Sequence, residues 1–263
     1  MRDDRRFARR TALLLTAFAI LAGCHTVLGP KPIDDNWRVY DGPRVSFFVR
    51  PGSVAEQNVA RLSEVIEDQY TATIRALRLS YAGHVRAYAY SSPGENKLEG
   101  NFSGSAYPET ESFAFVCVAP ITGNTFSLMA HEANHVFIIN GVGRAGTHFM
   151  TEGLATAVLS ETFHSNGRRF LFPWTRAHRP ELPKLTRLVH DDEWERVPSQ
   201  TAYNASASFL AWLLDTYGPD RIRDVFAASS DVIESRIMAV YGSSLDALEG
   251  DWLRFCDSYT GGA

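Results

Sequence analysis

Cysteine is scarce in this sequence, with three residues in 263. Cys24 lies near the N-terminus, whereas Cys117 and Cys256 are far from it and from each other. This separation does not match the closely spaced cysteine pairs that bind structural zinc. In an exported protein Cys117 and Cys256 could form a disulfide. Each stands among apolar residues, however, which favours two thiols buried in the core.

The sequence also lacks an apolar run long enough to span a membrane. The run at residues 11–22 has 12 residues, whereas a transmembrane helix needs about 20. A permanent membrane-spanning helix is therefore not expected from this run.

A concentrated basic surface is missing as well. The formal net charge is −4, and it becomes −7 when residues 1–23, which contain five arginines and two aspartates, are removed. Proteins that bind nucleic acids need clustered Lys and Arg side chains to neutralise phosphates. We therefore expect no nucleic acid partner.

The first 23 residues have the order of an export signal. Basic residues precede the apolar run, which ends at Leu21-Ala22-Gly23-Cys24. This quartet resembles the bacterial lipoprotein box, in which the cysteine receives lipid and becomes the new N-terminus. The resemblance implies a signal peptide over residues 1–23 and lipidation at Cys24. The alternative is a plain secretory signal with an incidental cysteine.

The residue after Cys24 bears on the expected location. It is His25, so the aspartate that retains lipoproteins in the inner membrane is missing. We expect a lipid-anchored protein of the bacterial cell envelope, on the periplasmic side of the outer membrane. Residues 24–36 contain two prolines and little apolar pattern, which predicts a tether between lipid and domain.

The pattern predicts one domain over residues 37–263, with an N-terminal α/β lobe over 37–120 and a helical lobe over 121–263. In the first lobe we expect strands at 45–49, 85–90 and 112–119, a helix at 53–79 and a polar loop at 91–111. The second lobe has helical periodicity throughout. Helices are expected at 125–140, 147–163, 200–217, 219–229, 231–241 and 243–259. The fold class is therefore α+β.

The run His131-Glu132-Ala133-Asn134-His135 carries metal-site chemistry. On a helix, residues four apart lie on one face, so His131 and His135 can bind the same ion. Glu132 is one residue further round, where its carboxylate lies beside the ion and can accept a proton from the attacking water. The run predicts two zinc ligands and a general base.

A catalytic zinc site needs a third protein ligand. The metzincin pattern fails, because Ile138 and Gly141 stand where it has a glycine and a histidine, and no cysteine lies close to the histidines in the sequence. What remains is Glu152, which a helix hairpin can bring back to the two histidines. The alternative is that Glu152 only favours its helix N-terminus, with Glu161 or another histidine as the ligand.

His-Glu-x-x-His followed by Glu152-Gly-Leu-Ala resembles the gluzincin branch of metallopeptidases, the peptidase MA-like domains of bacteria. Residues 203–218 are similar to the helix that these domains carry after the zinc site, and Trp252 also fits. The resemblance covers roughly residues 45–257. It implies zinc as the cofactor, a zincin-type fold with the site between the lobes, and a peptide or protein substrate. It also makes Tyr203 the first candidate for the group that stabilises the oxyanion, against the alternative of a tyrosine that packs on the core.

The resemblance further implies that an extended substrate borders the region of residues 91–119, where these enzymes pair a peptide with a strand edge. One position departs from the pattern. Relatives of the thermolysin type commonly place an acidic residue four after the glutamate ligand to hold a histidine, and this sequence has Thr156 there. Its hydroxyl could accept the same hydrogen bond more weakly.

The expected function is zinc-dependent hydrolysis of peptide bonds, with the water activated by Glu132. Two alternatives remain. One is a lipid-anchored binding module that keeps the fold without catalysis, and the other is a zinc hydrolase that acts on a non-peptide amide.

Overall fold

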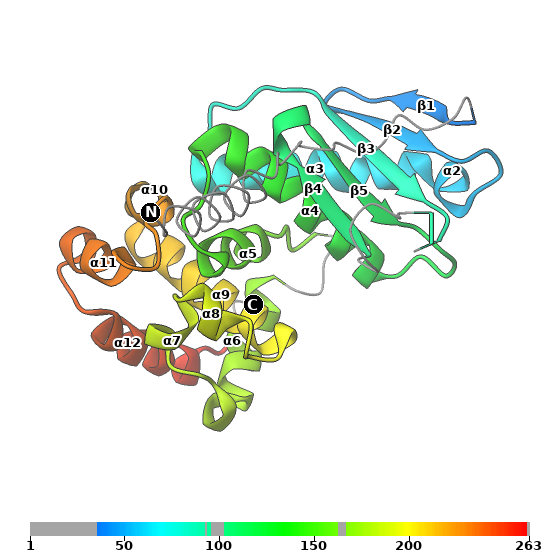
Figure 1. Cartoon of the computed structure of the whole chain (residues 1–263). Coiled ribbons are helices and arrows are strands. Elements are labelled where there is room, and N and C mark those ends of the chain that lie inside the picture. Colours follow the sequence, from blue (N-terminus) through cyan, green and yellow to red (C-terminus); the bar gives the residue numbers. More distant parts are fainter. Residues whose placement is uncertain (1–35, 93, 96–102, 163–166, 262–263) are drawn as a thin grey trace, which may run out of the picture.

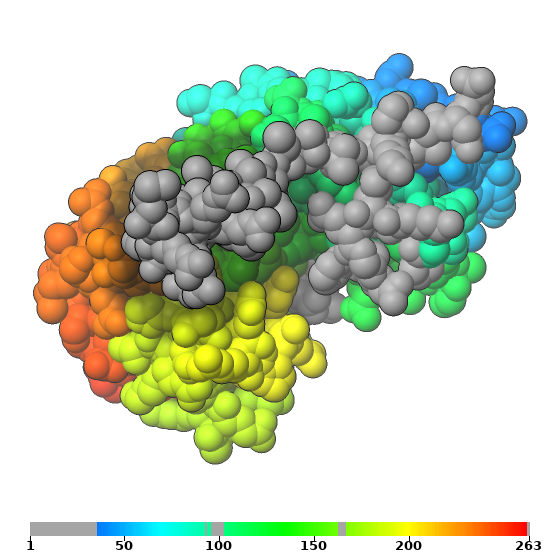
Figure 2. Space-filling view, viewed as in Figure 1, coloured from blue at the N-terminus to red at the C-terminus, as the bar shows by residue number. Residues whose placement is uncertain are grey.

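The computed structural model of the chain describes residues 36–92, 94–95, 103–162 and 167–261. Its N-terminal part holds a five-stranded sheet, and most of the remainder is helical (Figure 1). This confirms the α+β fold class. In the space-filling view the blue and cyan residues near residue 50 lie at the opposite end of the molecule from the orange and red residues near 250 (Figure 2).

The sheet has the order β1-β2-β3-β5-β4. The three central strands β2, β3 and β5 are parallel, while β1 and β4 lie antiparallel at the two edges. The strands are β1 (Arg38–Asp41), β2 (Val45–Val49), β3 (Val85–Tyr90), β4 (Gly104–Tyr107) and β5 (Ser112–Val116).

The helices nearest the sheet are α2 (Val54–Gln57), α3 (Val59–Leu77) and α4 (Gly123–Val142). Helices α3 and α4 run along one face of the sheet (Figure 1), where apolar side chains from both pack on β2, β3 and β5. The buried side chains of α3, such as Leu62, Val65, Ile66 and Gln69, follow the spacing of one helix face. Burial on the sheet thus fixes the position of α4, the helix that carries His131.

The rest of the described chain is helical and has a buried core of its own, centred on side chains such as Phe149, Phe209 and Trp252. Helix α5 packs closely on α9 because Gly153 has no side chain. A Cβ atom there would lie 2.9 Å from Ser206 Cβ and from a methyl carbon of Leu210. These helices are α5 (His148–Ala157), α6 (Arg168–Ala177), α7 (Leu185–Leu188), α8 (Asp191–Trp194), α9 (Ser199–Tyr217), α10 (Pro219–Phe226), α11 (Ile233–Tyr241) and α12 (Leu245–Ser258), with 3₁₀ turns η1 (Pro108–Thr110) and η2 (Arg179–Glu181).

Several expected boundaries were wrong. The helix expected at 53–79 is divided at Asn58, whose side chain donates to the carbonyl of Val54. Helix α5 ends at Ala157 instead of near residue 163. Within the region expected to be a loop, β4 forms a strand against β5, so β5 is an interior strand and β4 is the edge. No helix among the described residues is both long and apolar enough to cross a membrane.

Candidate metal centre

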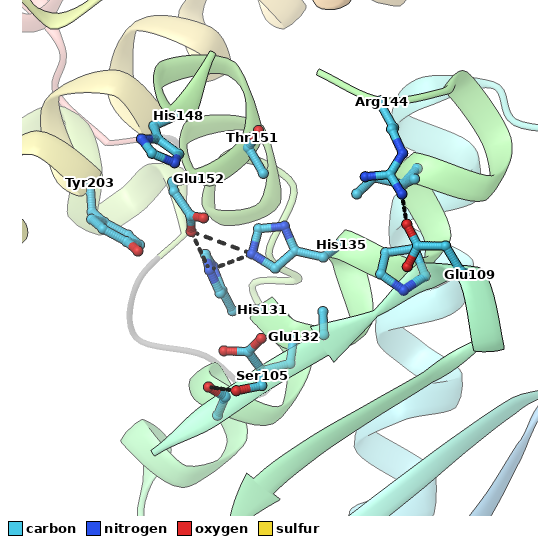
Figure 3. A pocket seen from close by; sticks show the side chains of 14 residues that line it. Ser105, Glu109, His131, Glu132, His135, Arg144, His148, Thr151, Glu152 and Tyr203 are labelled. Carbon is cyan, nitrogen blue, oxygen red and sulfur yellow. Dashed lines mark hydrogen bonds and ion pairs between the residues drawn. The ribbon is translucent and has the colours of Figure 1, made fainter. Parts of the chain in front are cut away.

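A cleft of about 630 Å³ lies between α4, α5, β4 and the start of α9 (Figure 3). It is within the size range of small-molecule and substrate sites in proteins. His131, Glu132, His135, Glu152 and Tyr203 all line it. The fold therefore brings together every residue for which the sequence predicted a metal-binding or catalytic role in the domain.

The two histidines and Glu152 converge on one point. His131 and His135 stand one turn apart on α4, and their Nε2 atoms are 3.0 Å apart. Glu152, in α5, places Oε2 3.0 Å from Nε2 of His131 and 3.4 Å from Nε2 of His135 (Figure 3). Burial acts to raise the pKa of Glu152, but hydrogen bonds from both histidines outweigh it and hold that pKa well below its usual value. The carboxylate is therefore charged at neutral pH.

These three atoms fit a zinc ion. Zinc binds histidine nitrogen and carboxylate oxygen at about 2.0–2.2 Å with tetrahedral geometry, which separates neighbouring ligand atoms by roughly 3.4 Å. The separations of 3.0, 3.0 and 3.4 Å are close to that value. Among the described residues, His131, His135 and Glu152 form the cluster of three or more His, Cys, Asp or Glu side chains that could hold a metal ion.

Thr156 occupies the position at which the sequence departs from the gluzincin pattern. Its Oγ1 atom lies 3.1 Å from Nδ1 of His131. When Nε2 of His131 faces a metal, Nδ1 carries the proton and donates it to this hydroxyl, which fixes the orientation of the ring. The threonine thus makes the contact that the sequence suggested for it.

Glu132 lies beside the three converging atoms and points toward β4 (Figure 3). Burial raises its pKa to about 7, while the neighbouring charges of His131 and Glu152 act in opposite directions, the first lowering and the second raising it. A carboxyl group with a pKa near neutrality can both take up and release a proton. The carboxylate packs against Gly104, where a Cβ atom would lie 2.6 Å from Oε1 of Glu132.

Tyr203, near the N-terminus of α9, faces the three converging atoms from the side that lies opposite His135 in Figure 3. Its ring lies 5.8 Å from that of His131 and 5.8 Å from that of Trp194, measured between centroids. Burial, and then the charge of Glu152 and a hydrogen bond to it, raise the pKa of Tyr203. The hydroxyl stays protonated and remains a hydrogen-bond donor. The ring packs on its neighbours and Tyr203 lines the cleft, so its role in stabilising an oxyanion stays a prediction.

A buried polar network fixes α4 relative to α3 and α5. Asn134 donates to the carbonyl of Ala155 over 2.7 Å, and its own carbonyl accepts from Gln69 over 3.0 Å and from Thr73 over 2.7 Å. Gln69 in turn donates to the carbonyl of Val158 over 3.0 Å. Because Asn134 lies between the histidines in sequence and Ala155 follows Glu152, this network sets the distance between the two ligand-bearing helices.

Sequence reasoning missed several residues that line the cleft. Ser105 belongs to β4, which was not expected, and His148 begins α5 with its backbone N–H donating to Asp191 over 2.8 Å. At the end of the cleft beyond His135, Arg144 and Glu109 form an ion pair (Figure 3). The turn after α4 was recognised, but nothing in the sequence indicated that its arginine lies in the cleft.

Glu161, the alternative carboxylate, is not part of the cluster of candidate ligands and does not line the cleft. Glu161 accepts a hydrogen bond from the backbone of Arg169 and forms an ion pair with its side chain, away from the cleft. Cys117 and Cys256 are separate buried thiols and not a disulfide. Burial raises the pKa of Cys117 to about 11 and that of Cys256 to about 12, so both thiols are neutral core residues. Cys24 and the expected signal peptide lie outside the described residues.

No protein-family model and no curated protein matches the sequence. Among solved structures, the chain is similar to native leukotriene A4 hydrolase from Saccharomyces cerevisiae, with a TM-score of 0.50 and 12% sequence identity. This similarity covers 83% of the chain and 39% of the yeast protein. An aminopeptidase N family protein from Idiomarina loihiensis gives a TM-score of 0.42 at 14% identity, covering 86% of this chain and 42% of that one.

By their names, the first neighbour is a hydrolase and the second belongs to the aminopeptidase N family. At this level of identity, the likeness to the yeast hydrolase shows a shared fold alone. The chain spans about two fifths of the length of each neighbour.

Proposed function

We propose that this protein is a zinc-dependent peptidase. The observation that carries the proposal is the convergence of His131, His135 and Glu152 on one point, with separations that suit zinc, beside the buried carboxyl group of Glu132. A zinc ion held there would polarise the scissile carbonyl group and make the attacking water more acidic.

In the proposed reaction, Glu132 moves the proton. It accepts a proton from the attacking water and passes it to the nitrogen of the leaving amine, because one carboxylate can reach both groups when the peptide lies in the cleft. The packing of Glu132 against Gly104 holds the carboxylate in the space between α4 and β4.

In the proposed reaction, Tyr203 stabilises the transition state. Its hydroxyl lies across the cleft from Glu132 (Figure 3) and remains protonated. A donor aimed at the carbonyl oxygen as that oxygen gains negative charge lowers the barrier to hydrolysis.

Strand β4 offers a binding surface for an extended peptide. It is an edge strand of the described sheet and pairs with β5 on one side only. Its residues Gly104 and Ser105 line the cleft. The other edge of such a strand carries backbone donors and acceptors that a peptide can pair with. Backbone pairing supports a peptide substrate more than a compact non-peptide amide.

Two measurements test the proposed chemistry. The purified domain of residues 37–263 should contain close to one zinc ion per chain, and Glu132→Gln should keep the zinc while losing cleavage of a peptide library by about 100-fold or more. Glu161→Gln is the matched control, because it makes the same change at a glutamate away from the cleft, and it should retain activity. Full cleavage by Glu132→Gln would contradict the role of the base.

Other outcomes would support the alternatives. A zinc-free domain, with wild type and Glu132→Gln equally inert, would favour a binding module with a lapsed peptidase fold. A zinc-containing domain that is inert on peptides but hydrolyses small amides would favour the non-peptide hydrolase.

We also propose that the protein is exported and anchored by lipid at Cys24. The support is the order of basic residues, apolar run and Leu-Ala-Gly-Cys at residues 1–24. The full-length protein expressed in a bacterium should fractionate with the outer membrane, whereas Cys24→Ala should not be lipidated, as mass spectrometry of the mature chain would show. An unmodified N-terminus in the wild type would favour a plain secretory signal.

A further inference from the structure

A pair of opposite charges forms the end of the cleft beyond His135 (Figure 3). Arg144 and Glu109 line the cleft there, and Nη2 of the arginine forms an ion pair with Oε1 of the glutamate. Among the described residues that line the cleft, Arg144 is the only Lys or Arg. A substrate that extends past the proposed metal position on the side of His135 therefore meets this pair.

The two segments that carry the pair are held by other contacts. Arg144 lies in the turn between α4 and α5, where the backbone N–H of Gly146 donates to a carbonyl of α10 over 3.0 Å. Glu109 lies in η1, and the side chain of Asn140 on α4 donates to the carbonyl of Pro108 over 3.0 Å. Ion pairs between solvent-exposed side chains contribute little to stability. The pair therefore adds little to holding these segments in place.

The arginine can take a second partner. Its side chain is 70% exposed, against 34% for Glu109. Only Nη2 is paired among the described residues, so the donors on Nε and Nη1 are open to another group. A guanidinium group has five N–H donors and pairs well with carboxylates. Since the arginine is the more accessible partner, this end of the cleft favours a negatively charged group over an ammonium group.

We propose that Arg144 binds a carboxylate of the substrate on the His135 side of the bond that is cleaved. This inference rests on the peptidase function proposed above. The carboxylate belongs to an acidic side chain or to the C-terminus of the peptide, and it accepts hydrogen bonds from the donors that Glu109 leaves open. Glu109 weakens this binding, because its charge has the same sign as that of the incoming group. A neutral substrate group gains no charge-assisted hydrogen bond here.

The test uses the zinc-loaded protein and a peptide library whose cleavage products are identified by mass spectrometry. One cleaved peptide is remade with glutamate or glutamine at each position near the cut, and with a free or an amidated C-terminus. We expect the charged member of one such pair to have a kcat/KM about five- to tenfold higher. A preference for glutamate that survives amidation identifies an acidic side chain, whereas a preference lost on amidation identifies the C-terminal carboxylate.

The two members of the ion pair should act in opposite directions. Arg144→Gln should abolish the preference, whereas Glu109→Gln should increase it by about threefold or more, because it removes the competing carboxylate. If the pair only held the turn against η1, both substitutions would break the same contact and shift the preference in the same direction. Arg254→Gln is the matched control, because Arg254 is 71% exposed and forms an ion pair with Asp251 on α12. It should keep the wild-type preference.

Several results would overturn the inference and leave the peptidase intact. They are equal cleavage of all matched peptides by the wild type, a preference that survives in Arg144→Gln, and parallel effects of Arg144→Gln and Glu109→Gln. A preference for lysine that is lost in Glu109→Gln would do the same, since the pair would then recognise a cation through its glutamate. By contrast, a zinc-loaded protein that cleaves no member of the library would overturn the proposed function and this inference with it.

Discussion

Gly104 illustrates how one residue without a side chain can determine the position of a reacting group. The carboxyl group of Glu132 occupies the space where a side chain at residue 104 would stand, with Oε1 2.6 Å and Cγ 2.8 Å from the Cβ position. Contacts this short are repulsive, so any larger residue must displace the carboxylate or the edge strand. The contact links the end of β4 to the proposed base.

We expect Gly104→Ala to lower kcat by roughly 100-fold, because a shift of about 1 Å in a catalytic group has an effect of that size. The zinc content should stay that of the wild type, since the three atoms nearest to the Cβ position at residue 104 all belong to Glu132 and none to a candidate ligand. Steady-state kinetics and metal analysis of the same preparation check this. Ser105→Ala makes a small change at the next residue of β4 and should be far milder. An unchanged kcat in Gly104→Ala would show that Glu132 is free to move without loss.

Thr156 acts on the metal site through His131. Its hydroxyl is the hydrogen-bond partner of Nδ1 of His131, whereas Nε2 of the same ring faces His135 and Glu152. We expect Thr156→Val, which keeps the shape and removes the hydroxyl, to weaken zinc binding by about 10- to 100-fold. Thr156→Ser should retain most of the affinity. Competition with a zinc-binding dye gives both dissociation constants, and equal values for the valine and serine variants would exclude a role for this hydrogen bond.

At the scale of secondary structure elements, the candidate site depends on the relation between α4 and α5. Two candidate ligands come from α4 and the third comes from α5. The side chain of Asn134 on α4 forms hydrogen bonds to α5 and to α3. A leucine at this position would leave the carbonyl of Ala155 without its side-chain partner. Gln69 and Thr73 would keep the bond to each other but lose their shared acceptor.

We expect Asn134→Leu to reduce the free energy of unfolding by about 2–4 kcal/mol, because each buried polar group left unpaired costs roughly 1–3 kcal/mol. Chemical denaturation of the metal-free domain measures this without interference from zinc. Asn124→Leu is the control on the same helix, and since Asn124 is exposed it should change stability by less than about 0.5 kcal/mol. Equal stability of the two variants would contradict the structural role of the network.

The element scale also shows where prediction from the sequence succeeded and failed. Helix α12, whose buried residues lie on one face, was located to within two residues, because burial on one side imposes a period that the sequence displays. Strand β4 was missed, because Gly-Ser-Ala-Tyr has little intrinsic strand preference and forms a strand only through pairing with β5. Helix α6 was missed as well, and it contains Pro173, which normally argues against a helix interior.

For the molecule as a whole, metal binding should be coupled to stability. The candidate ligands join two helices that pack on different neighbours, α4 on the sheet and α5 on α9. An ion that binds the folded chain and not the unfolded one stabilises the folded state by about 2.7 kcal/mol when free metal is 100-fold above the dissociation constant.

We therefore expect zinc to raise the Tm of the metal-free domain by about 5–10 °C, since 1 kcal/mol corresponds to roughly 2–4 °C for a chain of this size. A chelator should reverse the shift. Scanning calorimetry with and without zinc measures it, and His131→Ala should show little response to the metal. A wild type whose Tm does not respond to zinc, or an equal rise in His131→Ala, would mean that the stabilising metal does not bind at this centre.

The sequence by itself determined the chemistry of the candidate site. His131 and His135 lie on one face because four residues make about one helical turn, and this local geometry needs no knowledge of the fold. The third ligand required only one further step, a hairpin between two adjacent helices that returns Glu152 to the pair. Export and lipidation were likewise inferred from a local pattern at residues 1–24 and remain proposals.

Only the tertiary structure decided what surrounds that chemistry. The edge strand against Glu132 and the ion pair of Arg144 with Glu109 depend on segments that are distant in sequence. No periodicity encodes such contacts, because they arise when the sheet, α4 and α9 are packed together and each leaves particular atoms facing the others. Sequence pattern thus predicted the proposed reaction, whereas packing shaped the cleft in which it would take place.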